Sequence, residues 1–406
     1  TALPDGDAPR ESMIYLETGR TDAKARKALA AALDQTLAEV RSAVGDWPAM
    51  KAGMAADAAA LESRDAESAA LLRWLGADML TLLGHVTHYR DGREEKLLGA
   101  CKKGAKPLLA EPSWRRAFLW FDAKPKNRSL LVIKSNRISS VHRAAPLDLF
   151  IVPVFEGDEL VALSTHAGVW TSAALAAPPQ EVPGLRAQLS ALMTKFGFAA
   201  GGHNGKALVH ALTALPHDIL ASFDSRDIER VATTMMSLVE RPRPRLMLVT
   251  APLDRHLFAF VWLPRDAIST GTRLEIEAML TKAADGPVLD WSLEVESSNL
   301  ALLRFVIDIR EGAKIPDEAA LDRRLALMLR GWGEAVEDEL ALSMDASRAA
   351  ELAATYADAF PLSYRAACGP AEAASDIIGL SALALTGRGV RLHGRAQDGE
   401  IGRAHV

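Results

Sequence analysis

The sequence has little cysteine and no strong excess of charge of one sign, and each shortage excludes a class of protein. Two cysteines among 406 residues, Cys101 and Cys368, cannot form a disulfide framework or a multi-cysteine metal site. They are typical of a protein of the reducing cytoplasm. The formal net charge of −5 also argues against a general affinity for nucleic acid, which needs a basic surface.

Long apolar runs are absent as well. No run reaches the ~18 residues that a membrane helix needs, and the N-terminus lacks the apolar core of a signal peptide. We therefore expect a soluble, cytoplasmic chain that binds neither a membrane nor nucleic acid.

Motifs for cofactors and metals are missing too. No Gly-x-Gly-x-x-Gly fingerprint occurs, and the nearest phosphate-loop resemblance, residues 200–207, lacks the first glycine and the Ser or Thr that would hold magnesium. We interpret it as a loop that opens a helix. His85 and His88 stand three apart without a further ligand motif and would point to opposite faces of a strand. The sequence thus predicts no catalytic, cofactor-binding or metal-ligating residue.

Hydrophobic periodicity is the positive signal. Helices are predicted over residues 22–41, 50–61, 185–198, 206–215, 226–239, 273–283, 319–342, 347–360 and 370–384. Strands are predicted over 118–121, 130–133, 147–155, 160–164, 245–250, 256–263, 288–295 and 302–309. A hairpin turn is predicted at 156–158, and a helix that leads into a strand is predicted over 71–84. Pro48 is expected to separate the first two helices. This pattern predicts an α+β fold in which helices pack on one face of each of two antiparallel sheets.

Two polar clusters are candidate sites. The first follows an apolar strand, so we expect its polar side chains to lie on one loop at a sheet end, where functional residues often gather. It comprises Lys134, Ser139, His142, Arg143 and Asp148. Nucleic-acid binding through these cations and Arg137 is disfavoured, because the cluster lacks an aromatic platform.

The second cluster comprises Arg265, Asp266, Thr270 and Arg273, at a predicted passage from strand to helix. Arginine beside a helix N-terminus favours an anion such as a carboxylate. The alternative is that Arg265 and Asp266 pair with each other and lock the corner.

Several segments together resemble one family. The run Leu263-Pro-Arg-Asp266, followed by Thr270 and Arg273, is similar to a signature of the large bacterial NAD-specific glutamate dehydrogenases. Further similar segments occur in the family's order, at Glu11-Ser-Met13, Asp46–Met50, Leu72–Leu75 with Leu83-Gly84, Lys134 with Ser139–Arg143 and Asp148, and Phe360-Pro361 with Tyr364-Arg365 and Asp376-Ile377. One departure is His217, which stands where the family has arginine.

The resemblance implies the N-terminal regulatory and assembly part of an NAD-dependent glutamate dehydrogenase. The parent enzyme would oxidise L-glutamate with NAD to 2-oxoglutarate and ammonium in amino-acid catabolism, and this chain alone would be inactive. Implied partners are the catalytic domain, which would hold NAD, further copies of the chain in a homo-oligomer, and an amino-acid effector. A self-standing ACT-like module that senses an amino acid is the alternative.

The resemblance also implies a division of the chain. The expected parts are the end of a preceding ACT-like module (1–20), a helical connector (21–64), an ACT-like module (65–172), a linker and helix (173–204), a second ACT-like module (205–312) and a helical segment (313–399). Residues 400–406 read as the translation of a sequencing adapter, and the chain does not begin with Met. We therefore expect a truncated reading frame with a non-native tail.

Overall fold

The structure is a computed structural model. It describes residues 13–15, 17–102, 105–124, 128–240, 243–295, 299–310, 313–361, 364–365, 368–384, 396–397 and 400–401. Most of the part expected to end a preceding module lies outside these residues, as do residues 402–406 of the expected tail.

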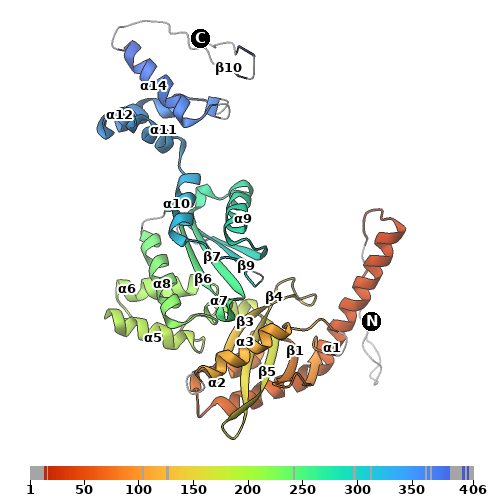
Figure 1. Ribbon diagram of the computed structural model, residues 1–406. Coiled ribbons are helices and arrows are strands. Elements are labelled where there is room, and N and C mark those ends of the chain that lie inside the picture. Colours follow the sequence, from red (N-terminus) through yellow and green to blue (C-terminus); the bar gives the residue numbers. More distant parts are fainter. Residues whose placement is uncertain are drawn as a thin grey trace, which may run out of the picture.

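The first unit is built around an antiparallel sheet. Its elements are α1 (Ala23–Leu61), α2 (Ala66–Trp74), the π turn η1 (Leu75–Met79), β1 (Leu80–Tyr89), β2 (Glu94–Gly99), α3 (Glu111–Asp122), β3 (Leu131–Ile138), β4 (Pro146–Glu156), β5 (Glu159–Trp170) and α4 (Ser172–Leu175). Among the described residues the strand order is β2-β1-β5-β4-β3. Met54 of α1 and Phe150 share the core on one face, while Trp114 and Phe118 of α3 pack on the other. Figure 1 shows the N-terminal half of α1 projecting beyond this sheet.

The second unit combines helices α5 to α10 with a second antiparallel sheet. Its elements are α5 (Leu185–Phe196), α6 (His203–Ala214), α7 (His217–Leu220), α8 (Ser225–Glu240), β6 (Arg245–Thr250), η2 (Pro252–Asp254), β7 (His256–Pro264), η3 (Arg265–Ala267), α9 (Thr270–Ala284), β8 (Val288–Val295), β9 (Leu300–Asp308) and α10 (Glu318–Met328). The strand order within the described chain is β6-β7-β9-β8. Met235 of α8 packs on one face beside Trp262, and Ile276 of α9 and Leu325 of α10 cover the other.

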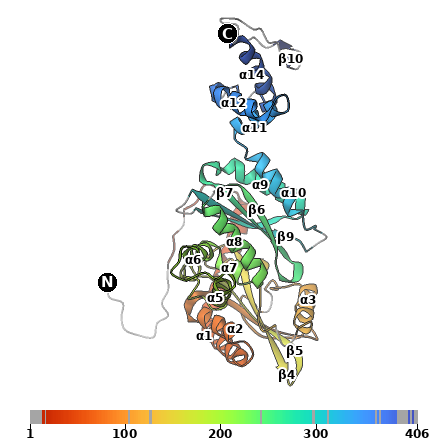
Figure 2. The same cartoon turned by 90° about the vertical axis from the view of Figure 1, so that its left-hand side faces the viewer.

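A helical part follows the second sheet. It contains α11 (Trp332–Ala341), α12 (Ala346–Tyr356), η4 (Ala357–Ala359) and α14 (Pro370–Ala384), and the short strands β10 (Ala396–Gln397) and β11 (Glu400–Ile401) pair with each other. These helices share a small core of their own around Val336 and Leu352. Both views show them at one end of the molecule, beyond the second sheet (Figures 1 and 2). No helix in the described ranges combines the length and apolarity needed to span a bilayer.

The predicted α+β class with two antiparallel sheets is confirmed. Helices cover both faces of each sheet, which is a more extensive packing than the one-faced arrangement expected. Strands β6 and β8 have the predicted bounds, and the hairpin between β4 and β5 turns at Gly157 with a positive φ of 63°.

Three predictions of local structure are wrong. Helix α1 continues through Pro48 instead of ending before it, because the residues on either side gain tertiary contacts. Asp46 accepts hydrogen bonds from the Gly99 amide and the Lys102 ammonium, and Met50 is fully buried. This packing offsets the ~3 kcal/mol that proline costs inside a helix.

The segment 118–121 is the end of α3 and not a strand. Trp114, Ala117, Phe118 and Phe121 are buried at helical spacing, whereas Leu119 is exposed. A short apolar run alone cannot distinguish these two structures. The helix predicted over 319–342 is also two helices, α10 and α11, separated at Gly331.

Candidate functional site

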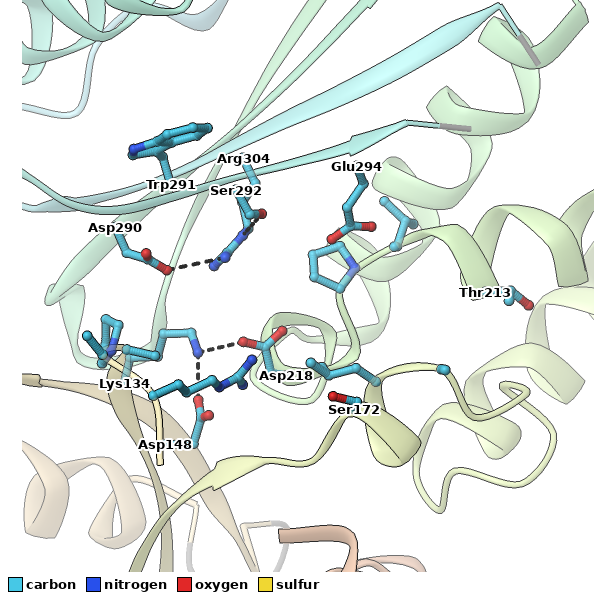
Figure 3. Close-up of a pocket in the computed structure, with 18 residues that line it drawn as sticks. Lys134, Asp148, Ser172, Thr213, Asp218, Asp290, Trp291, Ser292, Glu294 and Arg304 are labelled. Atoms are coloured by element: carbon cyan, nitrogen blue, oxygen red, sulfur yellow. Dashed lines mark hydrogen bonds and ion pairs between the residues drawn. The ribbon is translucent and has the colours of Figure 1, made fainter. Parts of the chain in front are cut away.

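The candidate site is a cavity of about 500 Å³ between the two sheets. One wall comes from β3, β4 and α4 of the first unit, another from α6 and α7, and a third from β8 and β9 of the second sheet (Figure 3). Its charged lining residues are Lys134, Arg143, Asp148, Asp218, Asp290, Glu294 and Arg304. A cavity of this size suits a small molecule.

Lys134 forms a buried ionic bridge at the base of the cavity. It lies directly opposite Asp148 in the pairing of β3 with β4, and its Nζ donates to Asp148 Oδ1 at 2.7 Å. The same Nζ donates to Oδ2 of Asp218, on α7, also at 2.7 Å. The Lys134 and Asp148 side chains are only 5% and 2% exposed. The bridge therefore ties the first sheet to the helices that precede the second one.

Burial, together with the charge of Lys134 between its two carboxylates, determines which groups of this bridge are protonated. Burial raises the pKa of Asp148 to about 6, against the opposing pull of Lys134. Burial acts in the same direction on Asp218, but Lys134 and then Arg304 outweigh it and lower the pKa of Asp218 to about 2. Burial would lower the pKa of Lys134, yet the two carboxylates raise it above its ordinary value. Lys134 is therefore a cation at neutral pH.

Arg304 brings a second buried cation to the cavity from β9. Its Nε donates to Ser292 Oγ at 3.0 Å, and its Nη2 donates to Asp290 at 3.2 Å. Its Nη1 is buried and has no hydrogen-bond partner in the described structure. The side chain lies on the same sheet face as Leu302 and Val306, because alternate residues of a strand share a face.

The first predicted cluster is only partly brought together. Lys134, Arg143 and Asp148 line the cavity, and Arg143 donates to the Trp170 carbonyl at 3.1 Å. Lys134 lies within β3 and not on the expected loop. Ser139 instead forms a local turn with Val141.

His142 is exposed, with a positive φ of 71°. Neither Ser139 nor His142 lines the cavity around Lys134.

The second predicted cluster lies at the passage from β7 to α9. Arg265 and Asp266 begin the short turn η3, and among the described residues no ion pair joins their side chains. Thr270 is the first residue of α9, which Ser269 caps. Arg273 pairs with Glu277 and lies 4.5 Å from the ring centre of Trp291. None of the four residues lines the cavity, although Trp291 does.

Sequence reasoning missed four charged residues of the site, Asp218, Asp290, Glu294 and Arg304. Asp218 follows Pro216 in the segment where His217 was singled out, and it lies 84 positions from Lys134. Arg304 is a charge in the middle of the apolar stretch 300–307, a pattern that suggests a buried ionic contact. Nothing in the sequence indicates which partner it meets.

A second buried polar cluster lies under α1. Nδ1 of His85 is 3.2 Å from Nδ1 of His166, and Nε2 of His166 is 2.7 Å from Asp57 Oδ2. Burial lowers the pKa of His85 to about 3. His88 stacks on Trp114 on the opposite face of the sheet, as its spacing from His85 predicts.

Comparison with known proteins places this architecture in a class. Family models for glutamate dehydrogenase match three parts of the chain: helical motif 1 over residues 182–241, the ACT2 domain over 245–333 and helical motif 2 over 339–383. The helices over 205–241, which were expected in the second ACT-like module, thus fall in the helical-motif match. The matched parts are thus an ACT domain, which contains the second sheet, between two helical motifs.

Relatives extend the match over most of the chain. NAD-specific glutamate dehydrogenases from Halomonas elongata, Pseudomonas aeruginosa and Mycobacterium tuberculosis are 27%, 26% and 23% identical to it over 88%, 92% and 92% of its length. The chain is therefore similar to NAD-specific glutamate dehydrogenases. It spans 24%, 25% and 24% of these three relatives, about a quarter of each.

Proposed function

We propose that this chain is a regulatory and assembly part of an NAD-dependent glutamate dehydrogenase. The whole enzyme would oxidise L-glutamate with NAD to 2-oxoglutarate and ammonium, and the described chain would itself be non-catalytic. The single observation that carries the proposal is the order of the matched parts, an ACT domain between two helical motifs of glutamate dehydrogenase.

The chemistry of the chain supports a non-catalytic role. The sequence has no glycine-rich dinucleotide fingerprint for NAD. The lysine of the cavity, Lys134, is held by two carboxylates and kept protonated. It is therefore suited to join units of the fold and not to abstract a proton.

The assembly role includes a homo-oligomer. Leu29, Leu33, Leu37 and Val44 form an apolar stripe on α1 that begins on its projecting half, at spacings of four and seven residues, and each is at least 43% exposed. Exposed apolar stripes of this kind are a usual means of helix pairing. We propose a second copy of the chain as the partner of this stripe.

Two measurements test the proposal. The purified chain, given L-glutamate and NAD, should produce no NADH above a blank. It should also co-purify with the separately expressed remainder of the Halomonas elongata relative, whereas a control chain of unrelated fold should not. Turnover by the chain alone, or a failure to co-purify, would overturn the proposed role.

A second candidate function is a self-standing module that senses a small molecule. The cavity between the sheets favours it, because three parts of the fold meet there around an unpaired arginine donor. This candidate predicts ligand binding without any association with a catalytic part, so the co-purification experiment separates the two.

A further inference from the structure

A short segment of the chain, residues 252–256, attaches the second sheet to the first unit. It consists of the turn η2, Arg255 and His256, the first residue of β7. Leu253 is buried in the core of the first unit, together with residues of α3 and β3. Its carbonyl oxygen also accepts a hydrogen bond from Arg116 of α3 at 3.4 Å. We call the contact between this segment and the first unit the joint.

A chain of polar contacts completes the joint. Arg255 donates from Nη1 to Ser113 Oγ of α3, and from Nη2 to Asn136 Oδ1 of β3 at 2.6 Å. Asn136 in turn donates from Nδ2 to Oδ2 of Asp308, the last residue of β9, at 2.8 Å. Arg255 is only 1% exposed. A buried cation and a single amide therefore hold the end of the second sheet against the first unit.

The backbone of the same segment is strained. Leu253 has φ of 66° and Asp254 has φ of 51°, in the left-handed region that residues with a Cβ rarely adopt. Such a conformation persists only where surrounding contacts impose it, and it is common in segments that switch between two states. Release of the turn from the first unit would relieve the strain at both residues.

Buried polar atoms without partners add to this cost. His256 is fully buried, and among the described residues neither of its ring nitrogens has a hydrogen-bond partner. Nε of Arg255 is also buried and unpaired in the described structure. A neutral imidazole carries one N–H, so at least one donor of His256 is buried without an acceptor. Burial of such a donor costs free energy that exposure to water would recover.

We propose that the joint is a conformational switch, in which residues 252–256 open from the first unit while both units stay folded. The second sheet could then move against the first unit. Strain and unpaired donors are concentrated in these five residues, and the parts of a protein that open first are those of lowest local stability. The inference goes beyond the proposed function and does not depend on it.

Protons favour the open state of the joint. Burial lowers the pKa of His256 to about 3. The charge of Arg255 acts in the same direction, and so do those of Lys134 and Arg310, whereas Asp308 opposes them. A histidine exposed to water has a pKa of about 6.5. Between about pH 3 and 6.5 the open state therefore binds a proton that the closed state excludes, and the closed joint loses stability as the pH falls.

Hydrogen exchange of the full chain under native conditions tests the joint. The reporters are the amides of Ala251 and Ile309, which donate to the carbonyl oxygens of His256 at 2.8 Å and Arg255 at 3.1 Å. We expect them to exchange through an opening that depends little on urea, whereas the amides in the centre of β7 exchange by global unfolding. After correction for intrinsic exchange, the opening constant should rise up to roughly tenfold from about pH 6 to about pH 5.

Two variants change the joint in opposite directions. His256→Leu replaces the unpaired ring by an apolar side chain, so it should lower the opening constant at neutral pH roughly tenfold and remove its dependence on pH. Asn136→Ala removes the acceptor of Arg255 and the donor to Asp308, so it should raise the opening constant roughly tenfold or more.

A matched control uses a buried histidine outside the joint. His85 lies in the first sheet, and its ring has a partner in His166. His85→Leu should therefore leave the pH dependence of the opening unchanged. Circular dichroism checks that each variant is folded. If His256→Leu does not fold, Asn136→Ala and the pH dependence of the unsubstituted chain decide the outcome.

Three results would overturn the inference. The first is exchange of Ala251 and Ile309 only through global unfolding, and the second is an opening constant that does not change with pH. The third is a higher opening constant in His256→Leu, which would mean that the ring has a partner that stabilises the closed joint. The proposed function is tested separately by co-purification, so its failure would be recognised independently of the exchange result.

Discussion

Replacement of Lys134 by methionine tests whether the buried bridge joins the two halves of the molecule. The substitution keeps the length of the side chain but leaves Asp148 and Asp218 facing each other without a cation. These carboxylates are 2% and 11% exposed, so water compensates them poorly. Removal of one partner from a buried ionic bridge typically costs about 3–5 kcal/mol. We expect Lys134→Met to lower the free energy of unfolding at neutral pH by that amount.

Matched variants separate this effect from the loss of an ordinary ion pair. Arg186 and Glu67 also join the first unit to the helices after it, at 2.9 Å, but their side chains are 43% and 39% exposed. Arg186→Met should therefore cost less than about 1 kcal/mol. The triple variant Lys134→Met, Asp148→Asn, Asp218→Asn also removes the two carboxylate charges that Lys134→Met leaves without a cation. It should therefore recover most of the lost free energy of unfolding.

Urea unfolding monitored by tryptophan fluorescence measures these differences, because Trp170 and Trp262 are fully buried reporters. The loss of unfolding free energy in Lys134→Met should become smaller as the pH falls, because Asp148 and Asp218 can then take up protons. The reasoning is refuted if Lys134→Met costs less than about 1 kcal/mol. It is equally refuted if the triple variant is no more stable than Lys134→Met alone.

Three further predictions concern other parts of the molecule. Burial lowers the pKa of His85 to about 3. Between about pH 3 and 6.5 the unfolded chain therefore binds a proton that the folded chain does not, and the free energy of unfolding falls as the pH falls. His85→Gln should reduce this pH dependence by up to ~1.4 kcal/mol per pH unit, as measured by urea titrations. Gly99 has φ of 57°, and a Cβ there would lie 2.3 Å from the Leu83 carbonyl oxygen, so Gly99→Ala should lower the unfolding temperature measured by calorimetry; an unchanged temperature would contradict the close contact. The double variant Leu33→Glu, Leu37→Glu should reduce the mass measured by light scattering to that of the monomer without changing the circular dichroism spectrum, and an unchanged oligomer would exclude this stripe of α1 as the contact.

Local patterns predicted a large part of the fold. Alternation and turn residues located β6, β8 and the hairpin at Gly157, because these signals depend only on near neighbours in the sequence. Asp224 precedes α8, and its carboxylate accepts the Asp227 amide at 2.9 Å, the local capping contact that aspartate commonly makes at a helix N-terminus. Lys134, Arg143 and Asp148 were placed among the candidate residues, and all three line the cavity.

The errors share one physical cause, which is that contacts distant in sequence outweighed local preference. Pro48 stays within α1 because Asp46 and Met50 are held by tertiary contacts. Phe118 belongs to a helix because its ring completes a buried stripe with Trp114 and Phe121.

The sequence by itself determined the resemblance of this chain to NAD-specific glutamate dehydrogenases, its α+β class and most of its strands, since collinear motifs and periodicity can be read one segment at a time. Only the tertiary structure decided what the charged residues do. Lys134 forms an ion pair with Asp218, which lies 84 positions away in the sequence. Arg304 donates hydrogen bonds to its neighbours on β8, but its Nη1 has no acceptor among the described residues. The energy of a charge depends on its burial and on the groups around it, and both exist only once the two sheets and the helices between them have packed together.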